Sequence, residues 1–484
     1  MSEQPTPSLL EQLQAHHQAG YFSLHMPGHK ENAALAPYLA QLGAEWDITE
    51  LPGFDDLHAP EGILAKMMDR AAALWSCLLV NGSTGGLLAA IRGATRRGDK
   101  ILVARHCHKA IYHAIELCGL DPVFLTPATE PTFGLAGSIT PDQVADALAQ
   151  HPDVKLIVYP SPTYDGILSD TAGICAIAHE KGIPVLVDEA HGAHLGLHPA
   201  FPPSAMGQGA DLAVASLHKM LPSLTQTAVL HATGARLSLP QVVRQAGIFQ
   251  SSSPSYLLMA SMDGCIRLLE EQGEELFSAW KARLDKFDRL ASGLKHLRLL
   301  GHGAEAGASY PGIFALDPAK ILISTRNSAL TGVELKNRLR EEYKIELEMA
   351  LDHYAVAMTG LGTDDTMPTR LAEALLALDK AAGPNEEPPA EPLPAYELPP
   401  RRMSLEEAAM APGGLTFLYD GIGKVCGEYI WAYPPGIPLV TPGEEITANL
   451  VETVETLYRS GVRLLGTRGK PPFTTFAVAD EENQ

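Results

Sequence analysis

The stretch Ala210–Lys219, ADLAVASLHK, joins a short apolar run to a lysine set among small and hydroxylated residues. The run is typical of a buried strand. Lys219 follows it within a few residues, with Ser216 and His218 beside it. A lysine in such a place is costly unless its charge is paired or removed, and forming a Schiff base removes it. The stretch therefore predicts a buried strand that leads to a reactive amine.

The arrangement of apolar run, turn and helix recurs on both sides of this stretch. LLVNGSTGGLLAAIRGA (78–94) and KILVARHCHKAIYHAIELCG (100–119) each predict a strand, a turn and a helix. KLIVYPSPTYDGIL (155–168) predicts a strand with a loop, and AIAHEKGIPVLVDEAHGAHLG (176–196) predicts a helix and then a strand. Strands that alternate with helices predict an α/β fold with a parallel sheet. The polar residues of interest follow strand ends, which is where ligands bind in such sheets.

The rest of the chain divides by composition. We expect an N-terminal segment (1–60) with a polar helix at 7–20, then a large domain (61–290) that ends in one or two long helices. A small α/β domain (291–383) and an extended linker (384–400) with seven prolines follow. A small α+β domain (401–484) completes the expected order.

Composition and charge exclude several classes of protein. The chain has 484 residues, of which 46% are apolar and 19% charged, so a large core can form. The formal net charge of −21 disfavours nucleic acid and anionic membrane as partners. The six cysteines form no Cys-x-x-Cys pair, and the N-terminus has no basic and apolar leader. We therefore expect a soluble, cytoplasmic protein with reduced thiols.

The turn Asn81–Gly86, NGSTGG, is a candidate anion site. Small residues between a strand and a helix leave backbone N–H groups free at the helix N-terminus, and Ser83 and Thr84 add hydroxyl donors. The turn matches neither the Walker pattern nor Gly-x-Gly-x-x-Gly. A tight turn without a ligand explains it equally well.

Asp188 ends a predicted buried strand in PVLVDEAHGAH (184–194) and is a candidate partner for a cationic ring nitrogen. A helix cap or a structural salt bridge is the alternative. Zinc is a further alternative, because Asp188, His191 and His194 are close in sequence, but His-Glu-x-x-His is absent from the sequence.

Taken in order, these features suit pyridoxal phosphate. Its phosphate needs N–H and hydroxyl donors, its ring nitrogen needs a carboxylate, and its aldehyde needs a lysine. The turn at 81–86, Asp188 and the Ser216-x-His218-Lys219 group supply these in turn.

At this point the sequence resembles the pyridoxal-phosphate-dependent ornithine/lysine/arginine decarboxylases of the aspartate-aminotransferase fold, in the shorter bacterial branch without a receiver-like domain. The resemblance covers nearly the whole chain. It rests on HMPGHK (25–30), DDLH (55–58), NGSTGG (81–86), HCHKA (106–110), PTYDG (162–166), DEAHGAH (188–194), SLHK (216–219), SSSPSYLLMASMD (251–263) and YPPGIPLVTPGE (433–444).

The resemblance implies roles for individual residues. Lys219 would carry the cofactor, Asp188 would pair with its ring nitrogen, and His108 would stack on its ring and, with Lys219, be a candidate proton donor. The other implied cofactor residues are Ser83, Thr84, Gly85, His191, Ser216 and His218, together with Ser252 and Ser253, which would reach the cofactor of a neighbouring subunit in a dimer or larger homo-oligomer. The implied substrate residues are Glu444, Asp56, His29, Tyr164 and Asp165, with Glu444 as the expected partner of the substrate's cationic tail.

The implied reaction is decarboxylation of a basic amino acid, with arginine as the first candidate, then lysine and ornithine. MMDRAAALWSC (67–77) departs from the family pattern, which expects Ala-Gln and then aromatic-Gly-Ala, and this puts substrate size in doubt. An aminotransferase or aldolase on the same fold is an alternative, with Arg326 as the candidate carboxylate ligand of an aminotransferase. An inactive regulatory paralogue is the other alternative, and intact Lys219 and Asp188 argue against it.

Overall fold

A computed structural model describes residues 7–20, 27, 30, 41–48, 51, 54–71, 75–385, 397–433, 437–459 and 462–479. The chain forms two compact units, and each is assembled from separate stretches of sequence. The first unit comprises Met1–Ala94 and Leu186–Ser278, and the second comprises Thr95–Val185 and Ala279–Gln484. The expected domains were continuous segments, whereas each compact unit combines two separate stretches of the chain.

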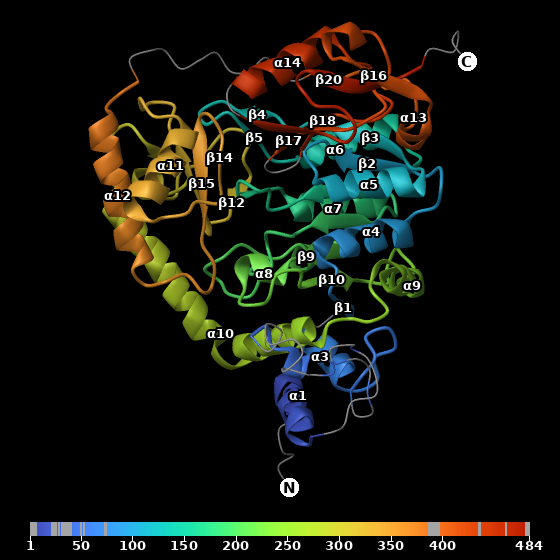
Figure 1. The fold of residues 1–484 in the computed structure, drawn as a ribbon, viewed down its shortest axis with the longest axis vertical. Coiled ribbons are helices and arrows are strands. Elements are labelled where there is room, and N and C mark those ends of the chain that lie inside the picture. The colour runs from blue at the N-terminus through green and yellow to red at the C-terminus, as the bar shows by residue number, and fades with distance from the viewer. Residues whose placement is uncertain are drawn as a thin grey trace. The chain divides into compact units, whose positions relative to one another are not determined.

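The first unit holds four strands in the order β1–β10–β9–β8, with helices packed on them (Figure 1). The strands are β1 (Trp75–Leu79), β8 (Val185–Asp188), β9 (Leu212–Ala215) and β10 (Ala228–Ala232). The helices are α1 (Leu9–Gln18), α3 (Ile63–Ala71), α4 (Gly82–Ala94), α8 (Leu217–Met220) and α9 (Leu239–Phe249), with short 3-10 turns at Ala44–Trp46 and Met206–Gln208.

Strand direction in the first unit differs in part from the prediction. β8 and β9 are parallel, as expected, but β9 with β10 and β10 with β1 are antiparallel. The connection between β9 and β10, residues 216–227, contains only the single turn of α8 and no crossover helix, and an antiparallel pair needs none. The strand before the NGSTGG turn, β1, therefore runs opposite to its neighbour.

Close packing sets the position of α4. A Cβ atom on Gly86 would lie 2.5 Å from Leu79 Cδ1 and 2.9 Å from Val214 Cγ1, so the glycine lets α4 approach the strands. Helix α9 packs on the same helix (Figure 1). A Cβ atom on Gly93 would lie 2.8 Å from Val242 Cα, so this glycine also allows a close approach. The start of α4 is thereby fixed over the ends of the strands.

The second unit begins with three parallel strands in the order β6–β2–β3. They are β2 (Lys100–Ala104), β3 (Asp121–Leu125) and β6 (Val154–Pro160), joined through α5 (Lys109–Cys118) and α6 (Pro141–Gln150) and followed by α7 (Thr171–Glu180). Short two-residue strands form two further pairs: β4 (Thr129–Glu130) with β5 (Leu135–Ala136), and β7 (Ile167–Leu168) with β12 (Ala315–Leu316). This part matches the predicted alternation of strands and helices.

An antiparallel sheet in the order β11–β13–β15–β14 follows, with α11 and α12 (Figure 1). The strands are β11 (Arg298–Leu299), β13 (Lys320–Ser324), β14 (Met349–Ala350) and β15 (Tyr354–Met358), the helices are α11 (Gly332–Tyr343) and α12 (Met367–Ala382), and Gly303–Glu305 is a 3-10 turn. Its core contains Phe133, Leu322 and Val356.

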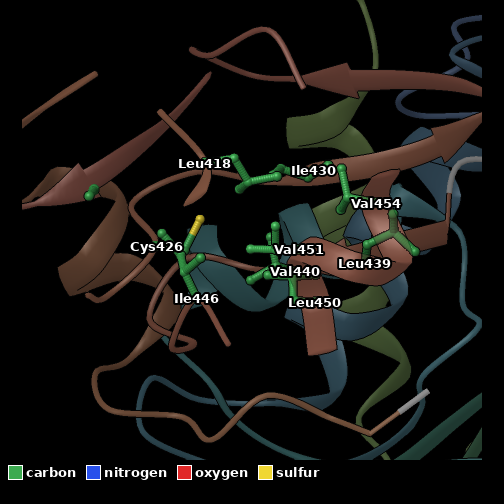
Figure 2. Close-up of a cluster of buried hydrophobic side chains, with 10 residues drawn as sticks. Leu418, Cys426, Ile430, Leu439, Val440, Ile446, Leu450, Val451 and Val454 are labelled. Atoms are coloured by element: carbon green, nitrogen blue, oxygen red, sulfur yellow. The ribbon is translucent and has the colours of Figure 1, made fainter. Parts of the chain in front are cut away.

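The C-terminal part of the second unit is α+β. Its strands are β16 (Gly413–Phe417), β17 (Ile430–Tyr433), β18 (Ile437–Val440), β19 (Arg463–Gly466) and β20 (Thr474–Val478), its helices are α13 (Leu405–Met410) and α14 (Ala448–Arg459), and Tyr419–Gly421 is a 3-10 turn. β16 pairs with β20, and β17 lies between β18 and β19. Ile430, Val440, Leu450 and Val454 meet in its buried apolar core (Figure 2).

Two further expectations concern the long helix and the linker. The one or two long helices predicted after residue 253 are a single helix, α10 (Tyr256–Ala291), which runs from the first unit into the second. Most of the Pro-rich linker, residues 386–396, lies outside the described residues. None of the helices in the described part of the chain is both long enough and apolar enough to span a membrane.

Candidate active site

Lys219 lies in α8, directly after β9, as the opening stretch predicts. Its Nζ atom is 3.1 Å from Nε2 of His191. If the ammonium donates to Nε2, the imidazole is neutral and carries its proton on Nδ1. The structure therefore brings together two of the predicted cofactor residues, from the loop after β8 and from α8.

Asp188 is the last residue of β8, and only 5% of it is exposed. Its Oδ1 atom accepts a hydrogen bond of 3.2 Å from the Ala190 N–H. Burial raises the pKa of Asp188, while the positive charge of Lys219 and the Ala190 N–H oppose that rise. An acid in this dry setting is suited to pair with a cation, because its charge has little competition from water.

Ser83 and Ser216 meet at the N-terminus of α4. The Ser216 hydroxyl donates to Ser83 Oγ at 3.0 Å, although the two residues lie on different elements. The Gly82 N–H donates to the carbonyl of Gln226 at 2.9 Å, which ties the start of α4 to the loop before β10. Gln226 has a φ of 85°, an uncommon conformation for a residue other than glycine. This contact was not predictable from the sequence, because no local pattern pairs Gln226 with Gly82.

The remaining residues of the turn have separate roles. Thr84 is exposed in the first turn of α4. Gly85 is buried, and a Cβ atom there would lie 3.1 Å from Asn81 Cβ, so the turn leaves little room for a side chain. With the helix dipole and free N–H groups, the turn is suited to hold an anion.

His218 contacts the backbone through one ring nitrogen. Its Nδ1 is 2.9 Å from the Thr227 carbonyl, and a carbonyl only accepts, so Nδ1 carries a proton. Nε2 is then an acceptor in the neutral ring. His218 can donate to a phosphate only as an imidazolium.

These groups fit pyridoxal phosphate. Within one unit the chain presents an amine beside a buried carboxyl, and a pair of hydroxyls at the N-terminus of a 13-residue helix. The zinc alternative has no comparable geometry, since His191 faces Lys219 and His194 packs edge-on against Phe201 with ring centroids 5.3 Å apart.

Other predicted residues lie in the second unit. His108 is the N-cap of α5, and its Nδ1 accepts from the Ala110 N–H at 3.2 Å, which fixes the ring on the loop after β2. Asp165 is 3.1 Å from the Tyr354 hydroxyl, and desolvation raises its pKa to about 6 against the effects of Tyr354 and of the Lys320 charge. The Tyr164 hydroxyl donates to Glu348. The roles predicted for these residues rest on their motifs.

Glu444 has a buried partner, Arg105, that no motif in the sequence indicates. Arg105 donates to its two carboxylate oxygens at 2.6 and 2.9 Å, and the Thr441 N–H donates to it at 2.8 Å. Arg105 and Glu444 are 4% and 2% exposed. These contacts favour a structural role for Glu444 within the second unit, and its assignment to the substrate stays a prediction from the motif.

The remaining predicted residues lie at the periphery of the first unit. Asp56 is exposed and accepts from the His58 N–H, whereas its neighbour Asp55 accepts four backbone N–H groups around the start of α3. Burial alone would raise the pKa of Asp55, but these four donors outweigh it and the pKa is lowered. Ser252 and Ser253 are exposed. His29 lies outside the described residues.

The fold and the site define a class. Solved structures that resemble the chain include the lysine decarboxylase LdcF of Francisella novicida (TM-score 0.80, 18% identity, 98% of this chain and 81% of that chain) and the constitutive lysine decarboxylase of Escherichia coli (TM-score 0.79, 18% identity, 98% and 82%). A pyridoxamine-pyruvate aminotransferase of Mesorhizobium loti is more distantly similar (TM-score 0.54, 17% identity, 72% and 90%). The chain thus has the fold of the type I enzymes that depend on pyridoxal phosphate.

The family follows from sequence. A model of the family described as Orn/Lys/Arg decarboxylase, major domain, matches residues 7–298. The chain is 32% identical over 479 residues to a protein named arginine decarboxylase from Halalkalibacterium halodurans, and 32% identical over 481 residues to one from Bacillus subtilis, with 96% of each chain covered in both cases. The chain belongs to the Orn/Lys/Arg decarboxylase family. The predicted family and fold class are confirmed.

Proposed function

We propose that the protein is an arginine decarboxylase that converts L-arginine to agmatine and CO2 with pyridoxal phosphate. Lysine and then ornithine are the next candidate substrates. The observation that carries the reaction type is the buried Asp188 beside the Lys219 amine, in a chain of this family. The choice of arginine is supported by relatives of that name that match over 96% of the chain.

When bound, pyridoxal phosphate supplies an electron sink for the pair of electrons left at Cα when CO2 departs. Lys219 would hold the cofactor through its ε-amine. Asp188 keeps the ring nitrogen protonated, because a buried carboxylate is stabilised by a cation at contact distance. Ser83 and Ser216, with the N–H groups of Ser83 and Thr84 in the first turn of α4, would hold the phosphate.

The amine of Lys219 is placed to move a proton. His191 accepts from or donates to Nζ at 3.1 Å, so it can hold the amine in one position and take up its charge. Lys219, or His108 as the motif implies, then protonates Cα in place of the lost carboxylate. His218 adds a charged donor to the phosphate when its ring is protonated.

An aminotransferase is the second candidate, and it needs an arginine for the substrate's α-carboxylate. A Cβ atom on Gly134 would lie 2.0 Å from one terminal nitrogen of Arg326, so that guanidinium packs against the loop between β4 and β5. Gly134 has a φ of 72°, and it leaves the space that the guanidinium fills. This contact supports a packing role for Arg326 and does not favour the aminotransferase.

The direct test is a product analysis. Purified protein with cofactor is incubated separately with arginine, lysine and ornithine, and the amine and CO2 are quantified. We expect agmatine and CO2 in equal amounts from arginine. Formation of a keto acid without CO2 would contradict the proposal.

Borohydride reduction and peptide mapping should place the cofactor on Lys219, and a label on Lys30 or Lys109 would contradict that assignment.

We further propose a homo-oligomer in the cytoplasm, with at least two copies. The exposed Ser252 and Ser253 support a contact across a subunit interface, as the motif implies. In the C-terminal part of the second unit, Leu415, Phe417 and Phe473 are 63%, 67% and 60% exposed, which is unusual for large apolar residues on a free surface.

A further inference from the structure

The first unit contains a cavity of about 570 Å³ whose lining includes none of the residues assigned to the cofactor. Its volume lies within the range of roughly 300–1,000 Å³ that is usual for small-molecule sites. Its floor is a row across three strands, where Leu78, Val229 and Ala215 lie opposite one another in register. The neighbouring Leu79 and Val214 contact α4, so the cavity lies on the sheet face away from α4.

Two helices supply much of the apolar wall. Ile266, Leu269 and Glu270 of α10 are spaced at i, i+3 and i+4, which places them on one helix face. Leu217 and Leu221, at and just beyond the ends of α8, also line the cavity. A ligand of matching shape would therefore have an aliphatic body.

Glu189 is the buried carboxyl group of this lining. It is 3% exposed, and the Ala205 N–H donates to its Oε1 at 2.7 Å. Because desolvation outweighs that single hydrogen bond, the pKa of Glu189 rises to about 8. At pH 7 the group is therefore mostly a neutral acid.

Among the polar groups of the lining, Glu189 is the one suited to bind a cationic ligand, because His231 is neutral and Arg70 is already ion-paired. Burial lowers the pKa of His231 to about 4, so its ring is neutral, and Nδ1 is 2.9 Å from Ser76 Oγ. Arg70 pairs with Asp263, which also pairs with Arg267, and Glu270 Oε2 is 3.5 Å from Arg70 Nε, so two cations face two carboxylates. The cavity thus combines apolar walls, a balanced ion pair and one buried acid.

We propose that this cavity is a second small-molecule site that takes an alkylammonium ion, with the alkyl chain on the apolar floor and the ammonium at Glu189. A cation leaves water for a largely apolar cavity only if a carboxylate offsets its desolvation, and Glu189 can become that carboxylate. The site goes beyond the proposed reaction and does not depend on it.

Binding is coupled to loss of a proton. Glu189 must pass from acid to carboxylate when the cation arrives, so one proton is released per ion bound below pH 8. The dissociation constant should fall about tenfold for each pH unit from 6 towards 8 and level off above that, because the acid no longer has to be deprotonated. If the cation instead bound a carboxylate that is already ionised, the dissociation constant would not change with pH in this range.

The test uses the holoenzyme and hexyltrimethylammonium, which has no N–H and cannot condense with an aldehyde. Titration calorimetry at pH 6, 7 and 8, in two buffers of different ionisation enthalpy, measures affinity and proton release. We expect one ion per chain, about one proton released at pH 6, and no change in the visible cofactor band. Glu189→Gln should weaken binding at pH 8 at least tenfold and remove the pH slope.

Glu271→Gln, on α10 but outside the lining, is the matched control and should bind as the unmodified protein does. Ala215→Leu, which fills the floor, is a second test that leaves Glu189 in place and should abolish binding. An unaltered cofactor band shows that each variant has folded. The proposal is overturned if the unmodified protein does not bind the ion, if neither variant weakens binding, or if the cofactor band moves. Binding by a protein that forms no amine from any basic amino acid would refute the proposed reaction and leave this site standing.

Discussion

Replacing Glu444 by glutamine tests whether this carboxylate has a structural role or binds the substrate. Its two oxygens are bound by Arg105 at 2.6 and 2.9 Å, and the pair is almost fully buried. Glu444→Gln keeps the shape but leaves the Arg105 charge without a counter-ion. Losing one partner of a buried pair costs about 3–5 kcal/mol. We expect the lower end, since the amide oxygen still accepts one hydrogen bond.

A loss of about 3 kcal/mol should lower the melting temperature of the second unit by roughly 5–10 °C. Calorimetry gives the melting temperature, and hydrogen exchange should show faster exchange in peptides that cover residues 437–446. The neighbouring Glu445 is the matched control, because its ion pair with Arg402 is partly exposed, at 23% and 57%. Glu445→Gln should cost no more than about 1 kcal/mol. Adding Arg105→Met to Glu444→Gln removes both charges and should restore part of the lost stability.

Kinetics supply the opposing outcome. If Glu444 binds the cationic tail, Glu444→Gln should weaken arginine binding by about 2–3 kcal/mol, which appears as a higher KM. The variant should also prefer arginine over citrulline less strongly than the unmodified protein does. The structural reasoning is refuted if that variant melts like Glu445→Gln and loses the preference. If the preference for arginine over citrulline is unchanged, Asp56 and Asp165 become the candidate partners of the cationic tail.

The other predictions concern the cofactor site and assembly. Asp188→Asn should lower kcat at least 10²–10³-fold while cofactor absorbance remains, and near-normal turnover would show that the pairing is wrong. Gly86→Ala should destabilise the protein by about 1–3 kcal/mol and weaken cofactor binding, because the new Cβ would lie 2.5 Å from Leu79; Gly264→Ala, with open space around it, should be neutral or stabilising. Sedimentation should find at least a dimer, and a fully active monomer would contradict the proposed assembly.

The elements with local signals were predictable from the sequence. Apolar runs that end in Asp188 or lead to Lys219 predict strands, and the structure has a strand at each of them. The direction of β1 was not predictable in this way, because pairing with β10 joins segments about 150 residues apart and depends on the short connection through α8.

The same limit applies to the candidate site. Ser83, Asp188, Ser216 and Lys219 could be selected because each ends or follows a strand, and strand ends gather at one edge of a sheet. The partner of Glu444 could not be found, since Arg105 is 339 positions away and no local pattern distinguishes it from other arginines. A motif shows that a carboxylate matters, and only the contacts show what it binds.

Asp188 and Glu189 are adjacent buried acids at the end of β8, and the groups around them differ. Desolvation is the main cause that raises the pKa of each. For Asp188 the nearby Lys219 charge opposes the rise, whereas only a backbone N–H does so for Glu189. Asp188 therefore lies beside a cation that favours its charged form, whereas we propose that Glu189 acquires its charge only when a cation arrives.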